Sequence, residues 1–334
     1  MCMIYTVFSV VLLGCLAMTH PDRHPILNHE NIARSSAMSR KCRQNVTKFH
    51  QNRWDRNIAR RWHDDYTNYT IYTEAPYYDV IPNDTWVLTP EGISGPYVYP
   101  PSQTLRQAIT ENQPGVPLWL DIGIINMDIC EPLSDVLVDI WHCNATGSYS
   151  SFTGLSPNIP FPQLLQELNI SNYQMGLTDI HTDRSTWLRG LWPTDCHGIM
   201  EVKTVFPGFY DDRTIHIHVQ VHTSWELREN GTIVTGNTIS TGQIYFPEKV
   251  SAAIMAIEPY ASHAQIARIT SAEDPFFSMD SAGGFDPIIH VVPVDQKNVI
   301  QGMVGYITLS VDTTLIRNGS QPWESGKKLD TRLI

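Results

Sequence analysis

Short runs rich in apolar residues, some of which partly alternate with polar ones, recur through the C-terminal two-thirds of the chain and are strand candidates. They lie at residues 119–127, 136–141, 198–205, 214–222, 241–246 and 301–311. Alternation with a period of two is typical of strands that bury one face, and turn residues such as Glu131-Pro132 separate the runs. Many short strands separated by turn signals favour an all-β sandwich or barrel over β-α-β units. We therefore predict an all-β fold, a β-sandwich, with no internal repeat.

The N-terminal region has a helical pattern instead. Within residues 39–62, apolar side chains recur near helical spacing with Arg and Lys between them: Val46, Phe49, Trp54, Ile58 and Trp62. This pattern predicts a basic amphipathic helix. Residues 20–63 hold ten Lys and Arg against three Asp and Glu, a local charge of +7. Either this arm lies against the acidic remainder of the chain, or it is cleaved or binds a partner.

Composition narrows the class of protein. Of the 334 residues, 42% are hydrophobic and 17% are charged, and an average globular protein has roughly 25% charged residues. These proportions exclude a disordered or fibrous chain. The net charge of −11 argues against a nucleic-acid partner, because such partners are held largely by contacts between cations and phosphates.

Several features predict a secreted, extracellular protein. Residues 1–17 form an uncharged apolar run with the length of a signal-peptide core, too short for a membrane span, although no Lys or Arg precedes it. No other stretch is long and apolar enough to span a bilayer. Seven Asn-x-Ser/Thr glycosylation motifs follow, at Asn45, Asn68, Asn83, Asn144, Asn169, Asn230 and Asn318. We expect a signal peptide at 1–18, a basic helical arm at 19–70, and a sandwich at 71–320 with a tail to 334.

Four cysteines remain after the predicted signal peptide: Cys42, Cys130, Cys143 and Cys196. In an oxidising compartment this number predicts two disulfides, which can pair in three ways. For Cys143 and Cys196, a structural disulfide is a better interpretation than a catalytic thiol.

The segment HIHVQVH at 216–222 is the strongest candidate for chemistry. On a strand, His216, His218, Gln220 and His222 share one face. Two histidines one residue apart can grip a metal ion, yet such a pair alone is more often part of an ordinary half-buried strand. Two tyrosines change this balance: Tyr210 stands six residues before His216, and Tyr149 ends the segment DIWHCNATGSY.

These segments resemble the intradiol ring-cleavage dioxygenases, in particular their secreted, single-domain eukaryotic branch. The motifs that carry the resemblance are DIWHCNATGSY at 139–149, WLRGLWPTDCHG at 187–198 and FPGFYDDRTIHIHV at 206–219. Weaker support comes from TPEGISGPY at 89–97, GVPLWLDI at 115–122 and STGQIYF at 240–246. The similarity extends over about residues 88–314.

The resemblance implies a set of site residues. The family's iron ligands fall on Tyr149, Tyr210, His216 and His218, with Tyr210 and His218 as the axial pair and Tyr149 and His216 as the equatorial pair. Arg213 matches an arginine beside the bound aromatic ring, and Gln243 matches a glutamine near the iron. Gly95, Pro96 and Tyr97 match a segment that lines the substrate pocket. Trp141 either walls the same pocket or is simply core. His222 is outside the family's ligand set.

The ligand types agree with the implied chemistry. Two phenolates favour Fe(III), whereas familiar oxygen-activating sites hold Fe(II) with two histidines and a carboxylate. The resemblance therefore implies one non-haem Fe(III) per chain that activates a catechol-type diol, which O2 opens to a cis,cis-muconate-type diacid. Tyr210 would act as a base and Arg213 would stabilise charge on the ring. The dimer-forming helical domain of bacterial catechol enzymes has no clear counterpart, which predicts a monomer.

Two other classes of function stay open. A secreted zinc enzyme could use His216, His218 and His222, with a fourth position open for water, but this leaves both tyrosines without a task. A sandwich that binds catechols or iron without turnover is the second alternative. The preferred catechol is not set by the motifs, because residues 150–186 and the stretch before Gly95 shape the pocket. A glycan on Asn144, inside the first motif, would have to point away from that pocket.

Overall fold

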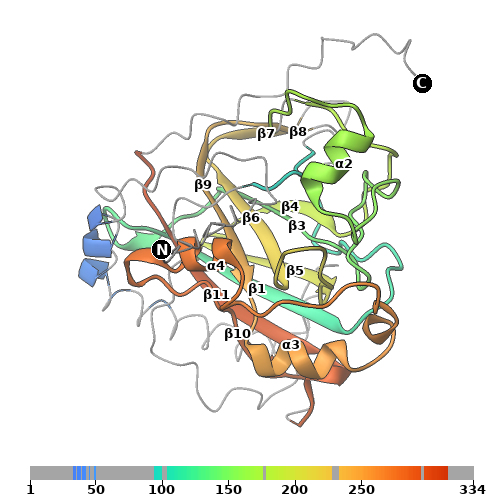
Figure 1. The fold of residues 1–334 in the computed structure, drawn as a ribbon. Helices are drawn as coiled ribbons and strands as arrows, with labels where there is room; N and C mark the ends of the chain where they lie inside the picture. Colours follow the sequence, from blue (N-terminus) through green and yellow to red (C-terminus); the bar gives the residue numbers. More distant parts are fainter. Residues whose placement is uncertain are drawn as a thin grey trace, which may run out of the picture.

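The computed structural model describes residues 33–34, 36–38, 40–42, 45, 49, 94–99, 104–175, 178–227, 233–294 and 297–314. The predicted signal peptide, most of the predicted arm and most of the tail lie outside these residues. The described part is a sandwich of two packed sheets (Figure 1).

The first sheet has five strands. These are β1 (Pro117–Asn126), β2 (Glu131–Pro132), β5 (Ile199–Val205), β10 (His290–Pro293) and β11 (Met303–Val311). Strand β1 lies in the middle: it pairs in parallel with β11 along one edge and antiparallel with β5 and β2 along the other. Strand β10 pairs antiparallel with β11.

The second sheet carries the predicted chemistry. Its order is β4-β3-β6-β9, with all neighbours antiparallel. The strands are β3 (Leu137–Trp141), β4 (Arg189–Pro193), β6 (His216–His222) and β9 (Thr238–Tyr245). A small hairpin of β7 (Trp225–Leu227) and β8 (Ile233–Thr235) follows β6.

The core fills the space between the sheets. Alternate residues of β1, from Leu118 to Ile124, are fully buried there together with Ile217, Val219 and Val221 of β6. Because side chains on a strand alternate between its faces, the intervening residues of β6 lie on the opposite face of the second sheet. His216, His218 and Gln220 are therefore directed away from the apolar core while remaining buried.

The helices are short and lie in the connections. They are α2 (Phe161–Glu167), α3 (Glu248–Met255) and α4 (Pro275–Asp280), with 3-10 turns η2 (Tyr260–Ser262), η3 (Ala282–Gly284) and η4 (Val299–Gln301). The all-β prediction is confirmed, and each predicted run contains a strand. Strands β4, β7, β8 and β10 and the three helices were not predicted, and β2 stands where a turn was expected at Glu131-Pro132.

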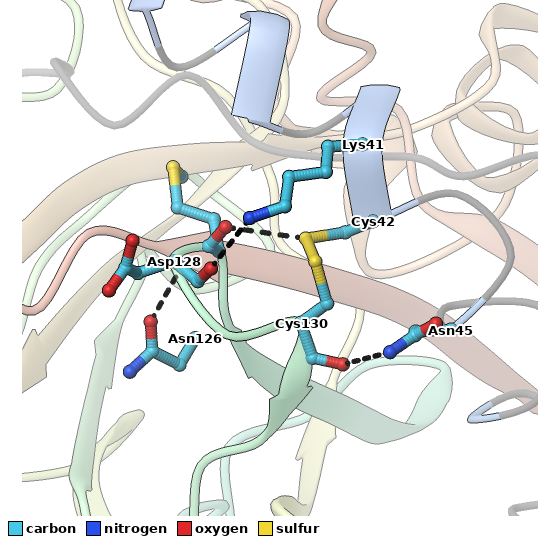
Figure 2. Close-up of a disulfide and its surroundings, with 7 residues drawn as sticks. Lys41, Cys42, Asn45, Asn126, Asp128 and Cys130 are labelled. Atoms are coloured by element: carbon cyan, nitrogen blue, oxygen red, sulfur yellow. Dashed lines mark hydrogen bonds between the residues drawn. A yellow bond between two sulfur atoms is a disulfide. The ribbon is translucent and has the colours of Figure 1, made fainter.

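The described residues of the arm are helical and lie against the first sheet. Cys42 forms a disulfide with Cys130, in the connection between β1 and β2, and Figure 2 shows the polar contacts around it. The Lys41 ammonium donates to the Asp128 carbonyl at 3.3 Å, and the Asn45 amide donates to the Cys130 carbonyl at 3.0 Å. The described part of the arm therefore lies against the remainder of the chain, which was the first of the two alternatives for this region.

The prediction of two disulfides is wrong. Besides the Cys42–Cys130 bond, the structure has Cys143 as a buried free thiol and Cys196 as an exposed one. Cys143 packs within an aromatic cluster beside Tyr149, whereas Cys196 lies in the surface turn after β4. Burial raises the pKa of the Cys143 thiol to about 12, so this thiol stays protonated.

Within the described residues, no helix has the length and apolar character needed to cross a membrane.

Candidate metal centre

Strand β6 presents His216 and His218 side by side on the outer face of the second sheet. Their Nε2 atoms are 3.1 Å apart. Backbone pairing places Trp141 of β3 on one side of His218 and Gln243 of β9 on the other. The Trp141 ring stacks on the His218 ring with centroids 5.0 Å apart and planes within 7°, so the histidine ring is fixed by packing as well as by the strand.

The His216 ring is oriented through its second nitrogen. Its Nδ1 lies 2.7 Å from the Thr214 carbonyl oxygen. Since a carbonyl only accepts, Nδ1 carries the proton and Nε2 keeps its lone pair. The lone pair is directed toward His218 and toward the Tyr210 hydroxyl, which is 3.3 Å away. This is the arrangement that metal-ligating histidines require.

The two tyrosines approach the histidines from loops. Tyr210 lies in the turn before β6, where the Arg213 amide donates to the Tyr210 carbonyl at 3.2 Å and Asp212 takes a positive φ of 61°. Tyr149 follows β3, with its ring centroid 5.6 Å from that of Tyr210 and 6.3 Å from that of His218. Among the residues that the structure describes, none forms a hydrogen bond of ordinary geometry with the buried Tyr149 hydroxyl. The structure thus brings all four predicted ligands to one place.

Arg189 of β4 fixes the loop that bears Tyr149 through hydrogen bonds to the next residue. Its guanidinium donates to the Ser150 hydroxyl at 2.9 Å and to the Ser150 carbonyl at 2.8 Å. At the start of the same loop, the Asn144 carboxamide oxygen accepts from the Thr146 and Ser148 amides. Asn144 therefore forms the turn itself.

Arg213 is completely buried and reaches three partners. Its Nε donates to Asp274 Oδ2 at 2.9 Å, its Nη1 donates to the Tyr210 hydroxyl at 3.3 Å, and its Nη2 donates to the Gln243 carboxamide oxygen. Gln243 then has a buried Nε2 amide with no partner within the described part of the chain. A spare donor beside the Arg213 guanidinium is suited to binding an oxygen atom of a ligand.

Residues 94–99 lie against His218 and the two tyrosines. A Cβ at Gly95 would lie 2.7 Å from His218 Cε1, and the φ of +71° also favours glycine there. Tyr97 stacks on Tyr149 with centroids 4.5 Å apart, and the Tyr173 hydroxyl donates to the Pro96 carbonyl at 3.3 Å. The segment predicted to line the pocket therefore lies against the candidate ligands.

An aromatic cluster surrounds the tyrosines. Phe152 and, from α2, Phe161 contact the Tyr97 ring edge-on. Their ring centroids lie 5.3 and 6.0 Å from that of Tyr97. Helix α2 lies within residues 150–186, which were expected to shape the pocket, and its buried residues Phe161, Leu164 and Leu165 join the same cluster. The described surroundings of the four donors are thus rich in aromatic and apolar side chains.

Burial dominates the electrostatics of the site. It raises the pKa of Tyr210 to about 12, against the lowering effect of Arg213. The pKa of Tyr149 rises further above its ordinary value, because burial and the nearby Tyr210 oxygen both oppose a negative charge. Burial lowers the pKa of Arg213, but Asp274 more than reverses this effect, so the guanidinium remains charged. Ionised tyrosines at this place need a strong positive charge beside them.

His222 is not part of the centre. Its Nδ1 lies 3.0 Å from the Thr238 hydroxyl, and the pairing of β6 with β9 shifts register between Val221 and His222. Burial lowers its pKa to about 4, so the ring is neutral. In the part of the chain that the structure describes, no three His, Cys, Asp or Glu side chains gather as a metal site. The three-histidine zinc site is therefore not formed.

The sandwich is similar to dioxygenases of known structure. An intradiol ring-cleavage dioxygenase from Tetranychus urticae superposes with a TM-score of 0.55 and 25% identity, over 70% of this chain and 98% of that one. A second dioxygenase structure gives a TM-score of 0.54 at 25% identity with the same coverage. This is the fold of the intradiol ring-cleavage dioxygenases. No family model and no curated protein matches the sequence.

The intradiol resemblance that the motifs indicated is thereby confirmed, and the comparisons support an enzyme of the intradiol ring-cleavage class. The sequence did not point to every residue that builds the site. Arg189 lies in the motif at 187–198 without an assigned role, and Asp274 was missed. Asp274 precedes a proline, which is a helix-start signal, and it does cap α4. Nothing in the local sequence links Asp274 to Arg213, 61 residues earlier.

Proposed function

We propose that the protein is a non-haem ferric intradiol dioxygenase, which cleaves catechol-type diols between the two hydroxylated carbons with O2 and yields cis,cis-muconate-type diacids. The observation that carries the proposal is the convergence of donor atoms from Tyr210, His216 and His218, with Arg213 directed at the same phenol. The likeness to dioxygenases of known structure supports the same class.

The donor set suits one ferric ion per chain. The two Nε2 atoms lie 3.1 Å apart, close enough for both histidines to bind one metal ion. Tyr149, Tyr210, His216 and His218 would hold the ion, and two phenolates favour the ferric state. When bound, it would supply a Lewis acid for both diol oxygens and accept electron density from the ring.

Tyr210 would take a proton from the substrate. A phenol whose pKa burial raises to about 12 is a strong base once it is ionised, and a catechol must lose both hydroxyl protons to bind through both oxygens. Arg213 Nη1 lies 3.3 Å from the same oxygen. It would stabilise the Tyr210 phenolate before the transfer and keep the phenol oriented after it.

Arg213 and Gln243 would act on the ring and its oxygens. Negative charge develops on the substrate as O2 attacks, and a fixed, buried cation stabilises such charge better than a solvated one. The spare Gln243 Nε2 donor would hydrogen-bond to a substrate oxygen. Tyr97, Pro96 and Trp141 would bind the apolar faces of the ring and exclude water.

A catechol or iron carrier without turnover is the competing function. A carrier needs the four ligands, but it has no use for a buried cation directed at a ligand phenol. The presence of Arg213 with its partners Asp274 and Gln243 therefore favours catalysis.

The visible spectrum of the purified, iron-loaded protein tests the proposal. We expect a red-brown charge-transfer band with about one iron per chain, which shifts when catechol is added without oxygen. Admitting air should restore the original band while a diacid forms. A band that shifts without oxygen consumption would indicate a carrier, and a colourless protein that takes up zinc but not iron would contradict the ferric site.

We also propose that the protein is a secreted monomer. The apolar run at 1–17, the seven glycosylation motifs and the Cys42–Cys130 disulfide support secretion. Recovery from the culture medium of eukaryotic cells, with a mass that falls on deglycosylation, tests it. Gel filtration of the same material tests the monomer.

A further inference from the structure

A buried carboxylate lies behind the arginine of the proposed catalytic site. Asp274 caps α4 and is completely buried, as is Arg213. Asp274 Oδ2 accepts from Arg213 Nε at 2.9 Å and from the Thr214 amide at 3.0 Å, while Oδ1 accepts from the Phe276 amide at 2.8 Å. The carboxylate is thus fixed by two backbone donors before it meets the arginine.

The contacts of Arg213 are divided between two sides. Its Nε edge faces Asp274, and its two terminal nitrogens face Tyr210 and Gln243. The Phe276 ring lies 4.5 Å from the guanidinium carbon, so α4 supplies both a counter-charge and an aromatic face. A planar guanidinium held along one edge and over one face has only one orientation left.

We propose that Asp274 is a positioning residue for the dioxygenase reaction, which directs the Arg213 guanidinium at the Tyr210 oxygen and the ring of the substrate. The inference rests on the proposed function and adds to it a residue from a distant segment. Asp274 touches no substrate atom in this scheme and acts only through Arg213. Its loss should therefore lower kcat more than it raises KM, since Arg213 acts on charge that develops during the reaction.

The first test compares Asp274→Asn with Asp280→Asn. Asp280 is the other buried carboxylate of α4 and accepts from the Tyr245 hydroxyl at 2.7 Å, so its loss also disturbs this helix without freeing the Nε edge of Arg213. We expect Asp274→Asn to lower kcat on the order of 100-fold with KM within about threefold, and Asp280→Asn to lower it less than about threefold. Equal losses in both variants would overturn the proposal, because packing of α4 would then explain them.

The second test needs no turnover. In the apoprotein of Arg213→Ala, the space left by the side chain and the remaining Asp274 carboxylate should bind guanidinium ion. Millimolar guanidinium chloride should raise the melting temperature of Arg213→Ala relative to equal sodium chloride, and should not raise that of Arg213→Ala/Asp274→Asn. In the iron-loaded proteins, the same salt should restore activity to the single variant only.

The two tests separate the two proposals. If the wild-type protein has no dioxygenase activity but guanidinium stabilises only the single variant, the function is wrong while Asp274 still anchors the cation. If guanidinium stabilises both variants equally, Asp274 is not the anchor even when the enzyme is active. Should Arg213→Ala fail to fold, the comparison of Asp274→Asn with Asp280→Asn decides alone.

Discussion

His216 and His218 occupy successive outward positions of β6, and their Nε2 atoms lie 3.1 Å apart. The spacing follows from the strand itself, because residues two apart on a strand share a face. Stacking of Trp141 on His218 and the bond from His216 to the Thr214 carbonyl fix both rings. The histidine half of the centre is therefore rigid, and the loops that bear the tyrosines complete it.

Replacing Tyr210 with Phe tests the tyrosine half. The change removes one proposed ligand and the proposed base but keeps the ring that packs against Tyr97. We expect turnover to fall on the order of 100-fold or more and the visible band to weaken. Tyr306→Phe, on β11 of the other sheet, is the control and should keep both. Unchanged turnover in Tyr210→Phe would refute the assignment.

Replacing Gly95 with Ala tests the close approach of residues 94–99 to the histidines. The added Cβ would lie 2.7 Å from His218 Cε1, so the histidine ring or the segment must move. We expect iron affinity to fall about 10-fold or more, as for other changes next to metal ligands, measured by competition with a chelator.

Gly284→Ala is the matched control for Gly95→Ala. Gly284 also has a positive φ, +84°, but no atom lies within 4 Å of an added Cβ. The variant should lose about 1 kcal/mol of stability and keep its iron. An equal loss of iron in both variants would show that backbone strain, and not contact with His218, causes the effect.

The Cys42–Cys130 disulfide is expected to stabilise the protein without serving the reaction. It joins residues 88 apart in sequence. Closing a loop of this size reduces the conformational entropy of the unfolded chain, which raises the free energy of unfolding by about 4–5 kcal/mol. Urea denaturation of Cys42→Ser/Cys130→Ser should show a loss approaching this value, with activity kept under folding conditions. Cys196→Ser, at an exposed free thiol, should change neither. A double variant as stable as the wild type would contradict the expectation.

Two buried histidines predict how stability depends on pH. Burial lowers the pKa of His142 and of His222 from 6.5 to about 4. Between pH 4 and pH 6.5 these histidines bind protons in the unfolded chain but not in the folded one. Their contribution to folding stability is therefore fully present above pH 6.5 and is lost as the pH falls toward 4. Each histidine contributes up to about 3 kcal/mol. Urea denaturation from pH 7.5 to 4.5 should show this slope, and His142→Gln should flatten it. An unchanged slope in that variant would contradict the assignment of His142.

The sequence predicted the strands that carry the ligands better than the connections. The runs around β1, β3, β5, β6, β9 and β11 were all found, because each alternates or carries a recognisable motif. Strand β4 begins with Arg189 and Gly190. A charged residue followed by a glycine is not a pattern that predicts a strand. Strand β10 has only four residues, too few for a periodic pattern.

The candidate site divides in the same way. Tyr149, Tyr210, His216 and His218 lie in compact motifs and could be named from the chain alone, and the structure brings them together. Asp274 and Arg189 act through contacts across the fold, which local patterns do not encode. The second disulfide was expected from a count of cysteines, and a count carries no information on the buried position of Cys143.

The parallel pairing of β1 with β11 has a consequence for how the protein is made. The central strand of the first sheet leaves the ribosome long before its partner, residues 303–311, has been translated. Until then one edge of β1 has no strand to pair with, whereas residue 130 is already available to Cys42. The nascent chain can thus gain its covalent link early and its complete sheet only at the end of synthesis. A chaperone that shields the edge of β1 would be needed most during that interval.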